Sequence, residues 1–152
     1  MLKKSILFLV VVLTVWSCSV DTESTSIPHP SKYFGRKIGD PGVLIPHSKI
    51  LEYYRFVEER SDRVKVVDIG ETTEGRPFYY AIVTSPENHA RLDNLINMNS
   101  KLYDPRGVSD GEIQKIIREG KTFMVANHQI HSTEVGASQG ALLMAYRMAI
   151  DT

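Results

Sequence analysis

Apolar residues recur at intervals of three and four along four parts of the chain, the spacing that places side chains on one face of an α-helix. In the first part, Ile50, Tyr54 and Val57 share such a face. In the third, Ser109 and Glu112 form the pattern of a capping box, which is typical of a helix start. The pattern predicts four helices, over residues 47–60, 92–102, 109–119 and 135–149.

Three shorter segments have the composition of β-strands. Residues 63–70 are rich in valine, and residues 78–84 follow after a turn that contains Gly75 and Pro77. These two strands predict a β-hairpin with a long loop. Residues 122–126 form a compact apolar run, which favours a buried strand. Because helices and strands are interleaved, we expect an α/β layered domain with a mixed sheet. With only three strands, the sheet would have an edge that lacks a neighbouring strand. We therefore expect a truncated domain.

The first residues have the pattern of an export signal. Lys3 and Lys4 precede an apolar run over residues 6–16, which is shorter than the roughly 20 residues that a membrane-spanning helix needs. The only cysteine, Cys18, follows at once, as in a bacterial lipobox. We therefore expect a lipoprotein signal peptide over residues 1–17, lipidation of Cys18, and a location at the bacterial cell envelope.

The chain then divides into two further parts. Residues 18–44 are expected to form a lipid-anchored tether and lead-in, in which residues 21–30 are polar and flexible. Residues 45–152 are expected to form the folded domain.

Composition narrows the class of protein. Hydrophobic residues make up 42% of the 152 residues and charged residues 24%, an ordinary globular balance. Lys and Arg together number 18, as do Asp and Glu, so no overall basic charge favours a nucleic-acid partner. A single cysteine excludes disulfides within the chain, so stability has to come from the core.

The candidate chemistry lies between the predicted strand 122–126 and the last predicted helix. His131 and Glu134 are three residues apart, and a strand-to-helix turn can aim both side chains at one point. Zinc accepts imidazole nitrogen and carboxylate oxygen. An alternative is that Glu134 interacts favourably with the helix dipole and His131 is a polar residue at a strand end. Spacing alone leaves both interpretations open.

The wider sequence resembles the zinc carboxypeptidase family, whose peptidases carry a His-x-x-Glu pair after a central strand. The resemblance covers roughly residues 45–150 and depends on the order and spacing of several short segments. These segments are Thr73–Pro77, Thr84–Asn88, Ala90–Asp93, Asp104–Gly107 and Asn127–Gln139. The resemblance implies a mixed, mainly parallel sheet flanked by helices, a zinc cofactor and a peptide substrate.

By the same resemblance, His131 and Glu134 would be the first two zinc ligands. A second ligand histidine, an arginine for the substrate carboxylate and a glutamate as general base would lie beyond residue 152. No catalytic residue is therefore assigned within this chain, and the chain alone is expected to be nearly inactive. Thr133 stands where some digestive members have a substrate-contacting arginine, so their specificity does not carry over.

Other interpretations remain open. Deacylases of similar fold share the His-x-x-Glu pair, so the chain could belong to an amide-bond hydrolase that acts on acylated amino acids. A non-catalytic envelope lipoprotein that binds peptide or glycan is an alternative from another class. His128 is three residues before His131, and in an extended strand the two would face opposite sides, so a packing or supporting role is expected for His128.

Overall fold

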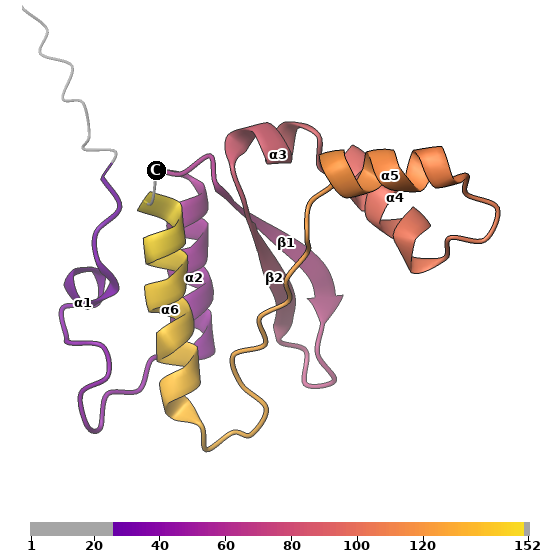
Figure 1. Ribbon diagram of the computed structural model, residues 1–152. Helices are drawn as coiled ribbons and strands as arrows, with labels where there is room; N and C mark the ends of the chain where they lie inside the picture. The colour runs from indigo at the N-terminus through magenta and orange to yellow at the C-terminus, as the bar shows by residue number, and fades with distance from the viewer. Residues whose placement is uncertain (1–25, 151–152) are drawn as a thin grey trace, which may run out of the picture.

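The computed structural model describes residues 26–150. The predicted signal peptide and Cys18 lie outside the described residues. Figure 1 shows the elements in chain order. They are α1 (Pro30–Tyr33), α2 (His47–Glu58), β1 (Val64–Glu71), β2 (Pro77–Val83), α3 (Pro86–Ala90), α4 (Leu92–Tyr103), α5 (Asp110–Glu119) and α6 (Val135–Ile150). None of the helices within residues 26–150 combines the length and apolar character needed to cross a membrane.

The predicted hairpin is confirmed. β1 pairs with β2 in antiparallel register, with Val64 opposite Val83 and Val66 opposite Ala81. The loop between them closes through a hydrogen bond from the Thr72 amide to the Arg76 carbonyl at 2.8 Å. Gly75 has a φ of 71°, the left-handed conformation that glycine adopts without a steric penalty, which explains the position of the turn.

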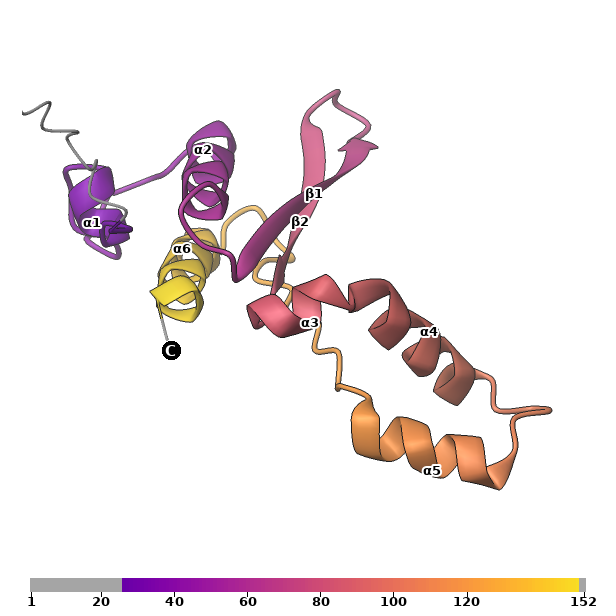
Figure 2. The same ribbon diagram turned by 90° about the horizontal axis from the view of Figure 1, so that it is seen from above.

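The core forms where α2 and α6 pack side by side against one end of the hairpin (Figures 1 and 2). Tyr53 and Val57 of α2, Val64 of β1 and Leu142 of α6 are at most 1% exposed. Tyr54 of α2 donates a hydrogen bond to the Ala141 carbonyl at 3.0 Å, which joins the two helices. The helical spacing and the valine-rich strand therefore place their apolar faces against each other, as expected.

Residues 26–44 pack on this core, although the sequence suggests a flexible tether through Pro30. Pro30 is fully buried at the first position of α1, where a proline ring fits without loss of a hydrogen bond. Tyr53 donates to the Pro28 carbonyl at 3.0 Å, and the His29 ring contacts Tyr146 edge-on. Ile38 also joins the core. Pro30, one of the two prolines that suggest a linker, is here a buried packing group.

The strand predicted over residues 122–126 is wrong. The structure assigns no helix or strand from Gly120 to Glu134, and this segment runs from α5 back past the hairpin to α6 (Figure 1). Met124 is 77% exposed and Val125 is 92% exposed. An apolar run becomes a strand only when a neighbouring strand accepts its hydrogen bonds, and neither β1 nor β2 does so.

The sheet seen in residues 26–150 therefore has two antiparallel strands. The expected mixture of helices and strands is confirmed, whereas the expected mainly parallel sheet is not seen in this part of the chain.

Helices α4 and α5 form a helical hairpin that lies apart from α2 and α6, beyond α3 (Figure 2). Leu95 of α4 and Ile116 of α5 are buried, and the two helices contact each other. As predicted, the Ser109 hydroxyl caps α5 by accepting a hydrogen bond from the Glu112 amide at 3.3 Å. The carboxylate of Glu112 does not complete the capping box. It forms an ion pair with Lys101 of α4 at 2.5 Å.

Candidate functional site

The candidate ligand pair lies in the turn directly before α6. The Glu134 amide donates to the His131 carbonyl at 3.1 Å, which folds the segment back on itself and brings the two side chains together. His131 Nδ1 lies 2.8 Å from Glu134 Oε1. The two side chains therefore point toward one another, and the segment is not part of a continuous helix.

The second carboxylate oxygen of Glu134 is held by the backbone. It accepts hydrogen bonds from the amides of His131 at 3.1 Å and Ile130 at 3.3 Å. The His131 side chain, and then these two amides, hold the pKa of Glu134 below its usual value. Glu134 is therefore ionised at neutral pH, which is the form that binds a metal cation.

The pair is open to solvent and has the chemistry of a zinc site. The side chains of His131 and Glu134 are 72% and 48% exposed. Their facing atoms are an imidazole nitrogen and a carboxylate oxygen, both of which zinc accepts in proteins. The two residues present therefore fit as part of a zinc site, without completing one.

A third ligand is not found in the described part of the chain. Among residues 26–150, no three His, Cys, Asp or Glu side chains lie close enough together to hold a metal ion. His128 belongs to no such group within these residues. His47 is the first residue of α2, as predicted, and its ring packs on Tyr79, while His89 Nε2 lies 3.0 Å from the Arg63 carbonyl.

Two glutamines support the turn and its surroundings. Gln129 Nε2 donates to the His131 carbonyl at 3.1 Å. Gln139 is 5% exposed, and its side chain accepts from the Gly39 amide at 2.7 Å and donates to the Val43 carbonyl at 2.6 Å. Gln139 lies within the predicted helix 135–149, and the sequence suggested no role for its side chain. One feature of the sequence could have indicated this role. Gln139 is a polar residue on the core-facing side of a helix, and a buried polar side chain needs hydrogen-bond partners.

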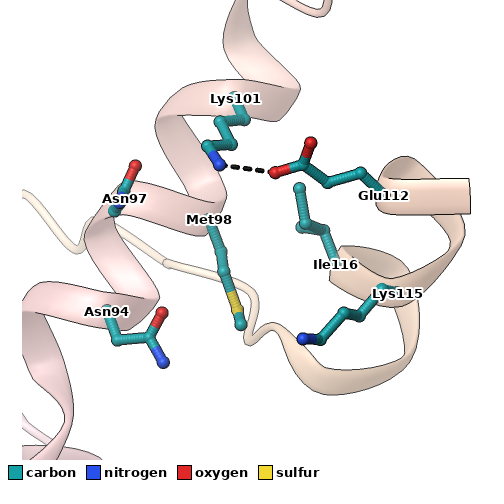
Figure 3. Close-up of a pocket in the computed structure, with 7 residues that line it drawn as sticks. All are labelled: Asn94, Asn97, Met98, Lys101, Glu112, Lys115 and Ile116. Carbon is teal, nitrogen blue, oxygen red and sulfur yellow. Dashed lines mark hydrogen bonds and ion pairs between the residues drawn. The ribbon is translucent and has the colours of Figure 1, made fainter. Parts of the chain in front are cut away.

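The surface of residues 26–150 includes two hollows whose positions can be compared with that of the pair. One, of about 160 Å³, lies between α4 and α5, where the side chains of Asn94, Met98 and Lys115 surround it (Figure 3). It contains neither His131 nor Glu134. The other, of about 370 Å³, is lined by residues on both sides of the pair, Gln129 and Val135, and by residues at the start of α2. The larger hollow is the one that adjoins the candidate site.

Comparison with known proteins identifies the family. A model of the zinc carboxypeptidase family matches residues 50–151, which include most of α2, the β-hairpin and the turn that carries His131 and Glu134. No curated protein and no solved structure matches the chain. The match spans most of the described fold and agrees in extent with the resemblance in the sequence. The chain therefore belongs to the zinc carboxypeptidase family.

Proposed function

We propose that the chain contributes to a zinc-dependent hydrolase of the metallocarboxypeptidase type, with His131 and Glu134 as two of the zinc ligands. The observation that carries this proposal is the 2.8 Å approach of His131 Nδ1 to Glu134 Oε1 in a solvent-open turn. Family membership supplies the reaction class, which is hydrolysis of a peptide bond.

The chain's own residues have a limited part in this chemistry. Bound zinc would lower the pKa of a water molecule and polarise the scissile carbonyl. His131 and Glu134 would hold the metal, and the backbone amides of Ile130 and His131 would keep the carboxylate ionised and oriented. A catalytic zinc site commonly has three protein ligands, and the reaction needs a base to take the proton of the water. The described residues offer two ligands, so weak metal binding and little peptidase activity are proposed for this chain alone.

A zinc titration of the purified chain tests the proposal. We expect His131→Ala to lower zinc affinity at least about tenfold, because even the outer partners of metal ligands commonly contribute 10–100-fold. Competition with a coloured zinc chelator gives the affinity, and a peptide hydrolysis assay of the zinc-loaded chain should show little turnover.

The matched control is His128→Ala, which removes a neighbouring imidazole outside the pair and should leave zinc affinity unchanged. Equal affinities for wild-type protein and His131→Ala would refute the ligand assignment. Robust peptide hydrolysis by the purified chain would refute the proposed inactivity.

We also propose that the protein is exported and lipidated at Cys18. The support is the sequence alone, namely the short apolar run after Lys3 and Lys4 and the single cysteine that follows it. In a bacterial host fed radiolabelled palmitate, the wild-type chain should incorporate label and sediment with membranes. Cys18→Ser should lose both properties, and label that persists in this variant would exclude lipidation at Cys18.

A further inference from the structure

A group of basic residues lies on α1 and the turn that follows it. Lys32, Arg36 and Lys37 are all exposed, and residues 26–39 contain no aspartate or glutamate. Among residues 26–150, neither Lys32 nor Arg36 forms an ion pair, whereas Lys37 pairs with Asp40 at 3.2 Å. We call Lys32, Arg36 and Lys37 the basic patch. Two of its three cations are available to an anionic partner.

The carboxylates on the neighbouring part of α2 are paired with cations of their own. The Tyr33 hydroxyl donates to Glu52 at 3.4 Å, and Glu52 forms an ion pair with Lys49 at 2.5 Å. Glu59, directly after α2, pairs with Arg60 at 3.0 Å. These carboxylates therefore leave the charge of the basic patch largely uncompensated.

The backbone holds the basic patch on the core. The Gly35 amide donates to the Lys32 carbonyl at 3.3 Å, and the Arg36 amide donates to the Ser31 carbonyl at 3.1 Å. The Ser31 hydroxyl accepts from the Ile38 amide at 3.1 Å, and Ile38 belongs to the buried core. The patch is therefore part of the folded domain and keeps a fixed position on its surface.

The basic patch lies at the outer edge of the described fold. Both views place α1 on the side of α2 and α6 that is opposite to the hairpin (Figures 1 and 2). The helical hairpin of α4 and α5 lies on the other side as well, beyond α3. A flat partner such as a membrane can therefore approach α1 without meeting the rest of the domain.

The proposed lipid anchor is close to this edge along the chain. Ser26, the first described residue, follows Cys18 by eight residues. A chain spans at most about 3.6 Å per residue, so a lipidated Cys18 would hold Ser26 within roughly 29 Å of the membrane surface. The Pro28 carbonyl already accepts a hydrogen bond from Tyr53 of the core at 3.0 Å. The anchor would therefore bring the side of the domain that carries α1 to the membrane.

We propose that the basic patch binds the anionic phospholipid headgroups of the membrane and turns α1 toward the bilayer. The orientation rests on the proposed lipidation of Cys18, whereas the attraction to the headgroups does not. A lysine or arginine near an anionic membrane strengthens binding about fivefold. Asp21 and Glu23 lie between Cys18 and the patch and oppose part of this attraction. The net gain from the patch is therefore severalfold.

Vesicle binding by the Cys18→Ser chain tests the attraction without an anchor. The chain is mixed with phosphatidylcholine vesicles that either contain or lack phosphatidylglycerol, and sedimentation gives the bound fraction. Binding should be severalfold tighter with phosphatidylglycerol at low salt, and the difference should disappear at high salt because exposed charges are screened. The apolar run over residues 6–16 meets both kinds of vesicle, so its contribution cancels in the comparison.

Two triple charge reversals locate the attraction. The first reverses the basic patch and should abolish the preference for phosphatidylglycerol; it combines Lys32→Glu, Arg36→Glu and Lys37→Glu. The matched control makes the same change of net charge at three exposed positions on α5 and directly after it, Lys115→Glu, Arg118→Glu and Lys121→Glu. The control should retain the preference, and both variants should show the far-ultraviolet circular dichroism of the wild-type chain. Equal behaviour of the two variants would overturn the patch.

Lysine labelling of the lipidated chain tests the orientation. Wild-type chain from a bacterial host is reconstituted into vesicles that contain phosphatidylglycerol, and mass spectrometry follows acetylation of Lys32 and Lys115. Lys32 should react severalfold more slowly in these vesicles than in detergent, whereas Lys115 on α5 should react at similar rates in both. Equal reactivity of Lys32 in vesicles and detergent would refute the orientation.

The outcomes separate the patch from the anchor. If Cys18 incorporates palmitate but the vesicle experiment shows no preference for phosphatidylglycerol, the anchor stands and the patch proposal fails. If the preference depends on the patch but Cys18 incorporates no palmitate, the patch binds headgroups and the lipidation proposal fails. Protection of Lys32 to the same extent in pure phosphatidylcholine vesicles would mean that the anchor alone covers α1, which also overturns the patch proposal.

Discussion

Replacing Leu142 with alanine should lower the free energy of unfolding by about 2–5 kcal/mol. Leu142 is fully buried at the centre of α6 and packs in the cluster formed by Tyr53, Val57 and Val64. The substitution removes buried apolar atoms and leaves a cavity between two helices and the hairpin, and close-packed surroundings collapse only partly into such a space. Urea denaturation followed by circular dichroism measures the change.

Leu102→Ala is the matched control, because Leu102 is 41% exposed on α4 and far from this cluster. Its substitution should cost clearly less than that of Leu142. A loss of stability for Leu142→Ala no larger than for Leu102→Ala would contradict the packing of α6 against α2 and β1. It would mean that residues 135–150 contribute little to the core that the structure shows.

The elements that depend on local pattern could be predicted from the sequence. The spacing of Ile50, Tyr54 and Val57 located α2, and the Gly75 turn located the hairpin, because a helix face and a tight turn depend on residues close together in the chain. Residues 122–126 show the limit of this reasoning. Their apolar run has strand composition, but pairing depends on a distant strand that no local pattern supplies, and the described fold leaves them unpaired.

The candidate site, like the fold, could be predicted from the sequence only in part. His131 and Glu134 could be singled out because their spacing and the surrounding segments resemble a family, and the turn places their side chains 2.8 Å apart. The role of Gln139 could not be predicted, because it depends on a hydrogen bond to Gly39, 100 residues away in the chain. The hollow beside the pair likewise requires three separate segments to meet. Local sequence therefore indicates the chemistry, whereas the binding surface around it emerges only from the tertiary contacts.

Gln139→Ala should lower the free energy of unfolding by about 1–3 kcal/mol, the sum expected for two lost hydrogen bonds. The side chain now joins the Gly39 amide and the Val43 carbonyl to α6, and at 5% exposure it has little access to water as a replacement partner. Loss of this link should also loosen the loop before α2, which Gln139 holds against α6. Urea denaturation measures the loss of stability, and amide hydrogen exchange of residues 39–43 measures the loosening of the loop.

Gln139→Glu separates the hydrogen bonds from the packing, because the shape of the side chain is kept. At neutral pH the introduced carboxylate still accepts from the Gly39 amide but faces the Val43 carbonyl without a donor. Burial raises the pKa of this carboxyl above its unfolded value of about 4.3. The stability of the variant relative to wild type is therefore recovered below about pH 4.3 and lost as the pH rises through the folded-state pKa. A destabilisation of Gln139→Glu that does not change with pH would show that Gln139 fills space in α6 and does not hold the loop through its two hydrogen bonds.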